Sequence, residues 1–366
     1  MEVQGSVAKR FEPVRECFAE IIAGQAGTGA AFAVWADGDW VVDLWGGHAD
    51  LARSRPWEAG SLVQPYSVSK PFAAICALRL AEAGRLDPDA PVQRYWPEFG
   101  AAATVRHVLS HQAGVVLLDR PVPTEAFYDW DYLCGLLAAQ EPAWQPGTAH
   151  GESALFYGHL VGELVRRVDG RGIGQFLREE ICGPHGLDFA FGLSPAQQAQ
   201  AVDLAGLDDR WRADTLAGRP SLYRRAATNP PGAQDGDVVN SARWRAAEIP
   251  AINGHGTARA LAGFYRALST GRLLSTGMLA EAITPQCRGW DQVLGEDSTW
   301  GLGFGIDADG YGMGGLGGSY GGTSTAGGYS AGFMTGSMGS FDRAEALENA
   351  LRDCLGVPPL PGTGVR

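Results

Sequence analysis

A serine and a lysine three residues apart, Ser67 and Lys70, are the pair in this sequence best suited to covalent chemistry. A serine hydroxyl is a weak nucleophile until a base takes its proton. A lysine can be that base where burial lowers its pKa, because burial disfavours the charged form. The apolar positions that follow predict a helix from Ser67 to about Ala83, on which residues i and i+3 share one face. The spacing therefore predicts Ser67 as nucleophile and Lys70 as its activating base.

The scarcity of lysine strengthens this interpretation. Of the 29 Lys and Arg residues, only Lys9 and Lys70 are lysines. Arginine supplies the surface charge, but its guanidinium stays protonated and cannot act as a base. At the start of a helix the Ser67 N–H has no intrahelical partner, so it can form half of an oxyanion hole. A capped helix start with a surface lysine is the alternative reading of the motif.

Hydrophobic periodicity predicts helices at both ends of the chain and strands beside them. The predicted elements are a helix at 10–23, a hairpin at 30–45, a helix at 257–268, Gly-rich strands between 300 and 334, and a helix at 342–355. This order predicts an α/β (α+β) fold with a central antiparallel sheet flanked by N- and C-terminal helices, plus a mostly helical lobe. We expect a discontinuous sheet domain of residues 1–84 and 241–366 and a helical insertion of residues 85–240.

Composition narrows the classes of partner. The formal net charge of −12 would repel a nucleic-acid backbone. The six cysteines are scattered without metal-ligand spacing, so we expect no metal and no cofactor. No apolar run reaches the ~18 residues of a membrane span, and the first nine residues are polar, so we expect no membrane association and a cytoplasmic location. Nothing in the sequence indicates an oligomeric state.

Several stretches resemble the superfamily of serine β-lactamases and penicillin-binding DD-peptidases, and are closest to the class C-like family VIII esterases and related transacylases. The resemblance covers most of the chain and rests on Tyr66-Ser67-Val68-Ser69-Lys70, on residues 86–92 and 95–97, on Thr104-Val105-Arg106-His107-Val108-Leu109-Ser110-His111-Gln112-Ala113-Gly114 and on Trp144-Gln145-Pro146-Gly147-Thr148. It implies a β-lactamase/transpeptidase-like fold and an acyl-enzyme on Ser67. Both histidines of the third stretch are expected to be structural.

The second motif of that family departs from its usual form. It normally begins with a tyrosine that takes part in proton transfer, six residues before a helix glycine. Counting back from Gly158, this position holds Glu152. A carboxylate with a suitable pKa can act as a base, so Glu152 is the third catalytic candidate, with a solvated residue in a degenerate site as the alternative. His150 is a nearby candidate for substrate binding, whereas Tyr157 falls inside a helical pattern and is expected to pack.

The third motif, usually Lys-Thr-Gly on a strand edge, corresponds to Gly312-Met313-Gly314-Gly315-Leu316. Met313 stands where the family has a polar residue, so the usual group that binds a substrate carboxylate is missing. Penicillin turnover is therefore not expected as the native role. Gly315 would keep the strand edge open to substrate, and the Leu316 N–H would complete the oxyanion hole with that of Ser67. Met313 and Gly315 are thus predicted to bind substrate.

These residues predict a serine acyl-transfer enzyme that takes its acyl group from a small-molecule ester or amide. Water as acceptor would make it an esterase-type hydrolase, and an amine or alcohol would make it a transacylase, which the altered second motif slightly favours. The alternative is a catalytically decayed binding member of the same fold. A second serine motif, Gly328-Tyr329-Ser330-Ala331-Gly332, matches the α/β-hydrolase elbow, but all seven histidines precede Ser330, whereas that fold needs its histidine afterwards.

Overall fold

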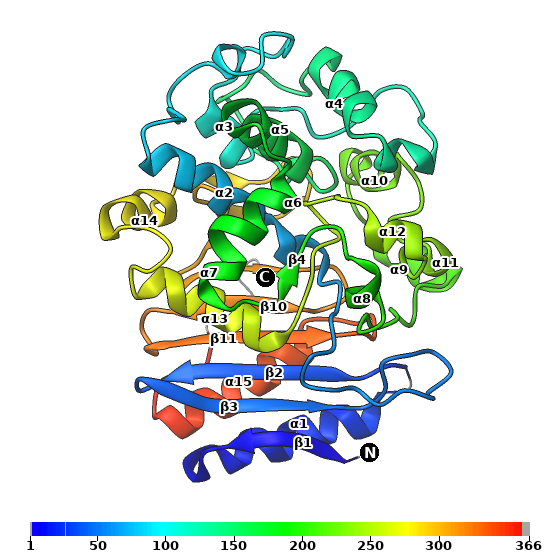
Figure 1. Ribbon diagram of the computed structural model, residues 1–366, viewed down its shortest axis with the longest axis vertical. Coiled ribbons are helices and arrows are strands. Elements are labelled where there is room, and N and C mark those ends of the chain that lie inside the picture. The colour runs from blue at the N-terminus through cyan, green and yellow to red at the C-terminus, as the bar shows by residue number, and fades with distance from the viewer. Residues whose placement is uncertain (1, 26, 361–366) are drawn as a thin grey trace.

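The computed structural model describes residues 2–25 and 27–360, and its centre is a nine-stranded antiparallel sheet of order β1-β3-β2-β11-β10-β9-β8-β7-β6. Figure 1 shows β1, β3, β2, β11 and β10 stacked from the bottom of the molecule upward, with most helices above them. The predicted fold class is confirmed. The strands are β1 (Val3–Val7), β2 (Ala30–Ala36), β3 (Asp39–Gly46), β6 (Cys287–Trp290), β7 (Asp297–Trp300), β8 (Gly305–Ile306), β9 (Gly310–Gly314), β10 (Tyr320–Ser324) and β11 (Tyr329–Thr335).

The predicted N-terminal hairpin forms as β2 and β3. Ala36 pairs with Asp39, which leaves a two-residue loop of Asp37 and Gly38, both with positive φ. Such a loop matches the right-handed twist of the flanking strands. Because successive side chains of a strand point to opposite faces, Phe32 belongs to one hydrophobic core and Ala33 to the other.

Helices cover both faces of the sheet. α1 (Glu12–Gly24) and α15 (Asp342–Leu355) pack together on one face, and α13 (Ala258–Ser269) packs on the other against β2, β10 and β11. Close approach of α13 depends on a glycine, because a Cβ at Gly332 would lie 2.6 Å from the Ala258 carbonyl oxygen. The predicted terminal helices and the helix after Thr257 are thus present.

In the region 85–240 the regular elements are helices apart from the two-residue β4, and α5 (Tyr157–Asp169) packs against α2 (Lys70–Glu82). The domain boundaries themselves stay a prediction. The remaining elements are α2 (Lys70–Glu82), α3 (Val105–Leu109), α4 (Trp130–Ala139), α5 (Tyr157–Asp169), α6 (Ile173–Phe176), α7 (Gly183–His185), α8 (Pro195–Gln198), α9 (Asp209–Leu216), α10 (Ser221–Thr228), α11 (Gly236–Val239), α12 (Ala242–Ala246), α14 (Thr276–Ile283), β4 (Phe189–Ala190), β5 (His255–Gly256), η1 (Lys9–Phe11), η2 (Tyr66–Ser69), η3 (Val92–Arg94), η4 (Thr124–Tyr128) and the π-helical η5 (Leu177–Cys182).

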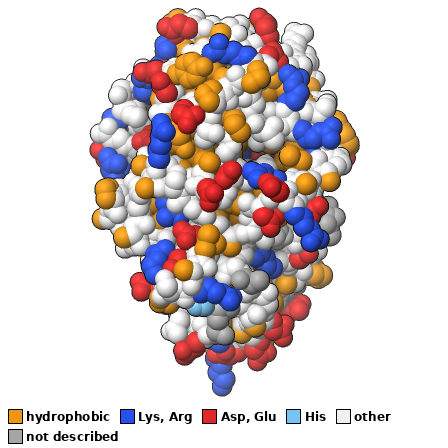
Figure 2. All heavy atoms as spheres, turned by 90° about the vertical axis from the view of Figure 1, so that its right-hand side faces the viewer, with side chains coloured by type: hydrophobic (Ala, Val, Ile, Leu, Met, Phe, Trp, Pro, Cys, Tyr) orange, Lys and Arg blue, Asp and Glu red, His pale blue; other side chains and the backbone are white. Residues whose placement is uncertain are grey.

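The surface carries both signs of charge. On the face drawn in Figure 2, basic and acidic side chains are interspersed among apolar ones over most of the surface. Within the described residues, no helix is long and apolar enough to cross a membrane.

Candidate active site

The nucleophile candidate lies in a tight turn between the sheet and a buried helix. Ser67 belongs to η2, a 3₁₀ turn, and α2 begins only at Lys70, so the helix starts three residues later than its pattern predicts. In a 3₁₀ turn residues i and i+3 eclipse each other, which brings the Lys70 Nζ to 2.7 Å from the Ser67 Oγ. Tyr66, just before Ser67, has φ of 49°, a strained conformation for a residue other than glycine.

Lys70 lies between Ser67 and Glu152. Its Nζ is 2.8 Å from the Glu152 Oε1 and 3.5 Å from the Ala251 carbonyl oxygen. The lysine side chain is fully buried, and the glutamate side chain is 10% exposed. Glu152 comes from the segment before α5 and therefore reaches Lys70 from the helical half of the molecule. The structure brings all three predicted catalytic residues together.

For both Lys70 and Glu152, burial shifts the pKa in one direction and the charge of the partner shifts it in the other. Burial lowers the pKa of Lys70, and the nearby carboxylate only partly offsets that effect. Burial would raise the pKa of Glu152, but the Lys70 ammonium, with smaller contributions from other neighbours, holds this pKa below its ordinary value. Glu152 is therefore a carboxylate at neutral pH. Burial, and to a smaller extent the charge of Glu152, raises the pKa of Tyr223, so the tyrosine hydroxyl stays neutral.

A cavity opens beside Ser67, with Glu152 in its wall. The third predicted motif forms another part of the wall, because Met313, Gly315 and Leu316 all line this cavity. Most of the other described residues of the lining are apolar or neutral: Tyr66, Ala154, Leu155, Tyr223, Ala227, Ala233, Gln234, Ile252, Leu294, Trp300, Gly305, Gly312, Gly314, Tyr320 and Phe341. The charged ones besides Glu152 are Arg219, Glu296 and Asp307.

The end of β9 is pressed against the nucleophile turn at Gly315. A Cβ at this position would lie 1.9 Å from the Pro65 carbonyl oxygen, so any larger residue would force the backbone to shift. The Gly315 N–H donates to the Ser319 carbonyl oxygen at 2.8 Å, and Leu316 follows at the cavity wall. Leu316 and Ser67 therefore line the same cavity, as two residues that share an oxyanion hole must.

His150 does not reach the cavity, unlike the other predicted substrate-binding residues. Its Nε2 lies 3.1 Å from the Ser298 Oγ in a buried position, and it is not among the residues that line the cavity. The backbone of His150 is held against the turn after β6, because its carbonyl oxygen accepts a hydrogen bond from the Gln292 N–H at 2.9 Å. A role of His150 in direct substrate contact is thus not supported by its position.

The two histidines of residues 104–114 hold the backbone around the site. The His107 Nδ1 accepts from the Thr104 N–H at 3.3 Å and closes a capping box at the start of α3. The His111 Nδ1 accepts from the Ser153 N–H at 3.2 Å, next to Glu152, and burial lowers the pKa of His111 to about 3, so the ring stays neutral.

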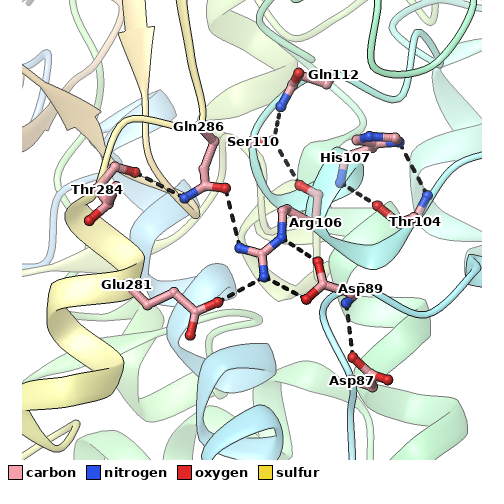
Figure 3. Close-up of polar contacts among 10 residues, drawn as sticks. All are labelled: Asp87, Asp89, Thr104, Arg106, His107, Ser110, Gln112, Glu281, Thr284 and Gln286. Carbon is pink, nitrogen blue, oxygen red and sulfur yellow. Dashed lines mark hydrogen bonds and ion pairs between the residues drawn. The ribbon is translucent and has the colours of Figure 1, made fainter.

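Figure 3 shows the contacts of Arg106, which belongs to the same stretch. Arg106 forms a bidentate ion pair with Asp89, an ion pair with Glu281 of α14 and a hydrogen bond with Gln286. The Nε–Oδ1 distance to Asp89 is 2.6 Å, and the Nη2–Oε1 distance to Glu281 is 2.8 Å. The stretch thus joins the helical half to α14 and to the segment that leads into β6.

Sequence reasoning missed several residues at the site. Tyr223 on α10 and Trp300 at the end of β7 line the cavity, and the buried Asp291 accepts a hydrogen bond from the Glu152 N–H. No motif marks them, because they come from segments far from Ser67 in sequence. Ser330 of the elbow-like motif lies instead inside β11, where its Oγ is 3.1 Å from the Thr323 Oγ1. In the part of the chain that the structure describes, no group of three His, Cys, Asp or Glu side chains could hold a metal ion.

Comparison with known proteins gives one consistent family. Residues 14–354 match the Beta-lactamase family, and the chain belongs to it. It is 35% identical over 352 residues to the esterase/beta-lactamase LipL of Mycobacterium tuberculosis, covering 88% of this chain and 80% of that protein.

Two solved structures have nearly the same fold. A family VIII carboxylesterase is 34% identical with a TM-score of 0.87, over 97% of this chain and 100% of the other. A penicillin-binding protein homologue from Caulobacter crescentus is 33% identical with a TM-score of 0.86, over 97% of this chain and 100% of the other. The resemblance expected from the motifs is confirmed.

Proposed function

We propose that this chain is a serine acyl-transfer enzyme that forms an acyl-enzyme on Ser67 from a small-molecule ester or amide. The observation that carries the proposal is the row of Ser67 Oγ, Lys70 Nζ and Glu152 Oε1, with separations of 2.7 and 2.8 Å beside one cavity. The names of LipL and the carboxylesterase, both at least 34% identical to this chain, support ester chemistry.

Acylation begins when the Ser67 Oγ attacks the donor carbonyl carbon. As the O–C bond forms, the Ser67 proton moves to the Lys70 Nζ, which passes one of its own protons to the Glu152 Oε1. The lysine stays an ammonium and the glutamate becomes neutral, while the carbonyl oxygen takes the negative charge. The backbone N–H groups of Ser67 and Leu316 stabilise that oxyanion. Collapse of the intermediate expels the leaving group, which receives the proton back through Lys70.

Deacylation repeats these steps with a second nucleophile. The acceptor gives its proton to the Lys70–Glu152 pair and attacks the acyl carbon, and Ser67 recovers its proton when it leaves. Water as acceptor gives an esterase-type hydrolase, and an amine or alcohol gives a transacylase. The apolar lining and Met313 favour donors without a carboxylate.

The test is intact-protein mass spectrometry after brief exposure to p-nitrophenyl butyrate, with Ser67→Ala as the control. We expect an added butyryl mass on the native protein and none on the variant. Loss of the adduct in buffer alone would identify a hydrolase, and faster loss with product formation on adding an amine or alcohol would identify a transacylase. Absence of both adduct and turnover in the native protein would refute the proposal in favour of a non-catalytic binding protein.

A further inference from the structure

Behind Glu152 lies a second carboxylate, Asp291, in the turn between β6 and β7. It is completely buried, yet none of its hydrogen-bond partners among the described residues is an Arg, Lys or His side chain. Burying a carboxylate without a cation is expensive unless hydrogen bonds replace its water. Its surroundings must therefore supply those bonds.

The hydrogen-bond donors to this carboxylate among the described residues are all neutral. Its Oδ1 accepts from the backbone N–H groups of Val293 at 2.9 Å and Leu294 at 2.8 Å. Its Oδ2 accepts from the Ser298 hydroxyl and the Trp300 indole N–H, both at 3.2 Å.

The Glu152 N–H lies between the two oxygens of Asp291, at 3.2 Å from Oδ1 and 3.1 Å from Oδ2. A further bond, from the Gln292 N–H to the His150 carbonyl oxygen at 2.9 Å, ties the same two segments together. The partners of Asp291 thus include residues that line the cavity: Glu152, Leu294 and Trp300.

We propose that Asp291 is a positioning residue that anchors the Glu152 backbone so that the glutamate carboxylate meets Lys70, an inference that rests on the proposed function of Ser67. A carboxylate is required because both of its sides face N–H donors. An asparagine of the same shape would turn its amide nitrogen toward N–H groups in either orientation. Supporting residues behind a catalytic group change its performance by about 10–100-fold at metal centres, and we expect a similar range here.

The decisive experiment is a double-mutant cycle on the rate of Ser67 acylation by p-nitrophenyl butyrate. We expect Asp291→Asn to slow acylation by about 10–100-fold with KM changed less than about threefold. In a Glu152→Gln background the same substitution should cost less than about threefold, because the group it positions is already disabled. Ser298→Ala, which removes one of the donors but leaves the Glu152 anchor, should slow acylation less than about threefold.

Equal losses from Asp291→Asn in both backgrounds, or no loss in the native one, would overturn the proposal. Hydrogen–deuterium exchange of the native protein tests the anchor even if Asp291→Asn fails to fold. We expect the Glu152 amide to exchange slowly, and exchange as fast as an exposed loop amide would also overturn it. If the native protein forms no Ser67 adduct, the proposed function fails, whereas slow exchange at Glu152 would still report the anchor.

Discussion

Replacing Lys70 alone should lower the stability of the fold more than replacing Lys70 and neutralising Glu152 together. The two groups are 2.8 Å apart and buried, and Coulomb's law with an effective dielectric constant near 20 gives an attraction of about 6 kcal/mol. Desolvation offsets part of this, so breaking such a pair costs about 3–5 kcal/mol. With an unfolding entropy of about 2 cal/mol/K per residue, Lys70→Met should lower the Tm by about 4–7 °C.

Differential scanning calorimetry of Lys70→Met, Glu152→Gln and the double variant measures this effect at pH 8 and at pH 4. The double variant should regain at least half of the loss, because it leaves no buried charge unpaired. In the native protein the lowered pKa of Glu152 gives stability that is present above the unfolded pKa near 4.5 and lost as pH falls through the folded pKa. Without Lys70, burial raises the pKa of Glu152, so the variant's deficit should shrink at pH 4. Additive losses in the double variant, or a deficit independent of pH, would refute the ion pair.

Two further predictions concern the strand edge. Gly315→Ala should slow Ser67 acylation by about 100-fold, because the new Cβ would lie 1.9 Å from the Pro65 carbonyl oxygen and move one side of the site. The matched control is Gly60→Ala, whose new Cβ would have no atom within 4 Å, and equal acylation rates in the two variants would contradict the close approach at Gly315. Met313→Lys should raise the ratio of kcat/KM for a carboxylate-bearing ester to kcat/KM for its neutral analogue by about tenfold, the effect of one charge-assisted hydrogen bond. Met313→Leu should leave this ratio unchanged, and an unchanged ratio in both variants would show that Met313 has no part in donor recognition.

The contact between Ser67 and Lys70 could be predicted because their relation is local. Spacing of three residues fixes the relative placement of Ser67 and Lys70 whether the turn is α or 3₁₀. The N-terminal hairpin was predictable for the same reason, since Asp37 and Gly38 specify its turn. By contrast β1 is exposed at most positions and lacks the alternation that marks a half-buried strand, so the sequence gives no signal for it.

The contacts behind the site could not be predicted, because they depend on how distant segments pair. Asp291 is 139 residues from Glu152, and its placement follows from the β6–β7 hairpin. The same pairing turns the His150 ring toward Ser298. Proximity in sequence therefore suggested His150 for the cavity, while the tertiary fold brings Tyr223 and Trp300 there instead.

The two departures from the family's motifs act on the same property of the site, its positive charge. Glu152 places a carboxylate 2.8 Å from the Lys70 ammonium, so the pair carries no net charge. Met313 puts an apolar side chain where the resemblance expects a polar one. Of the described residues that line the cavity, Arg219 is the one cation, and Glu296 and Asp307 more than balance it. An anionic donor would lose its hydration without a free cation beside the nucleophile. Under the proposed function, both departures therefore favour neutral donors, and Glu152 would do so as the proposed proton acceptor.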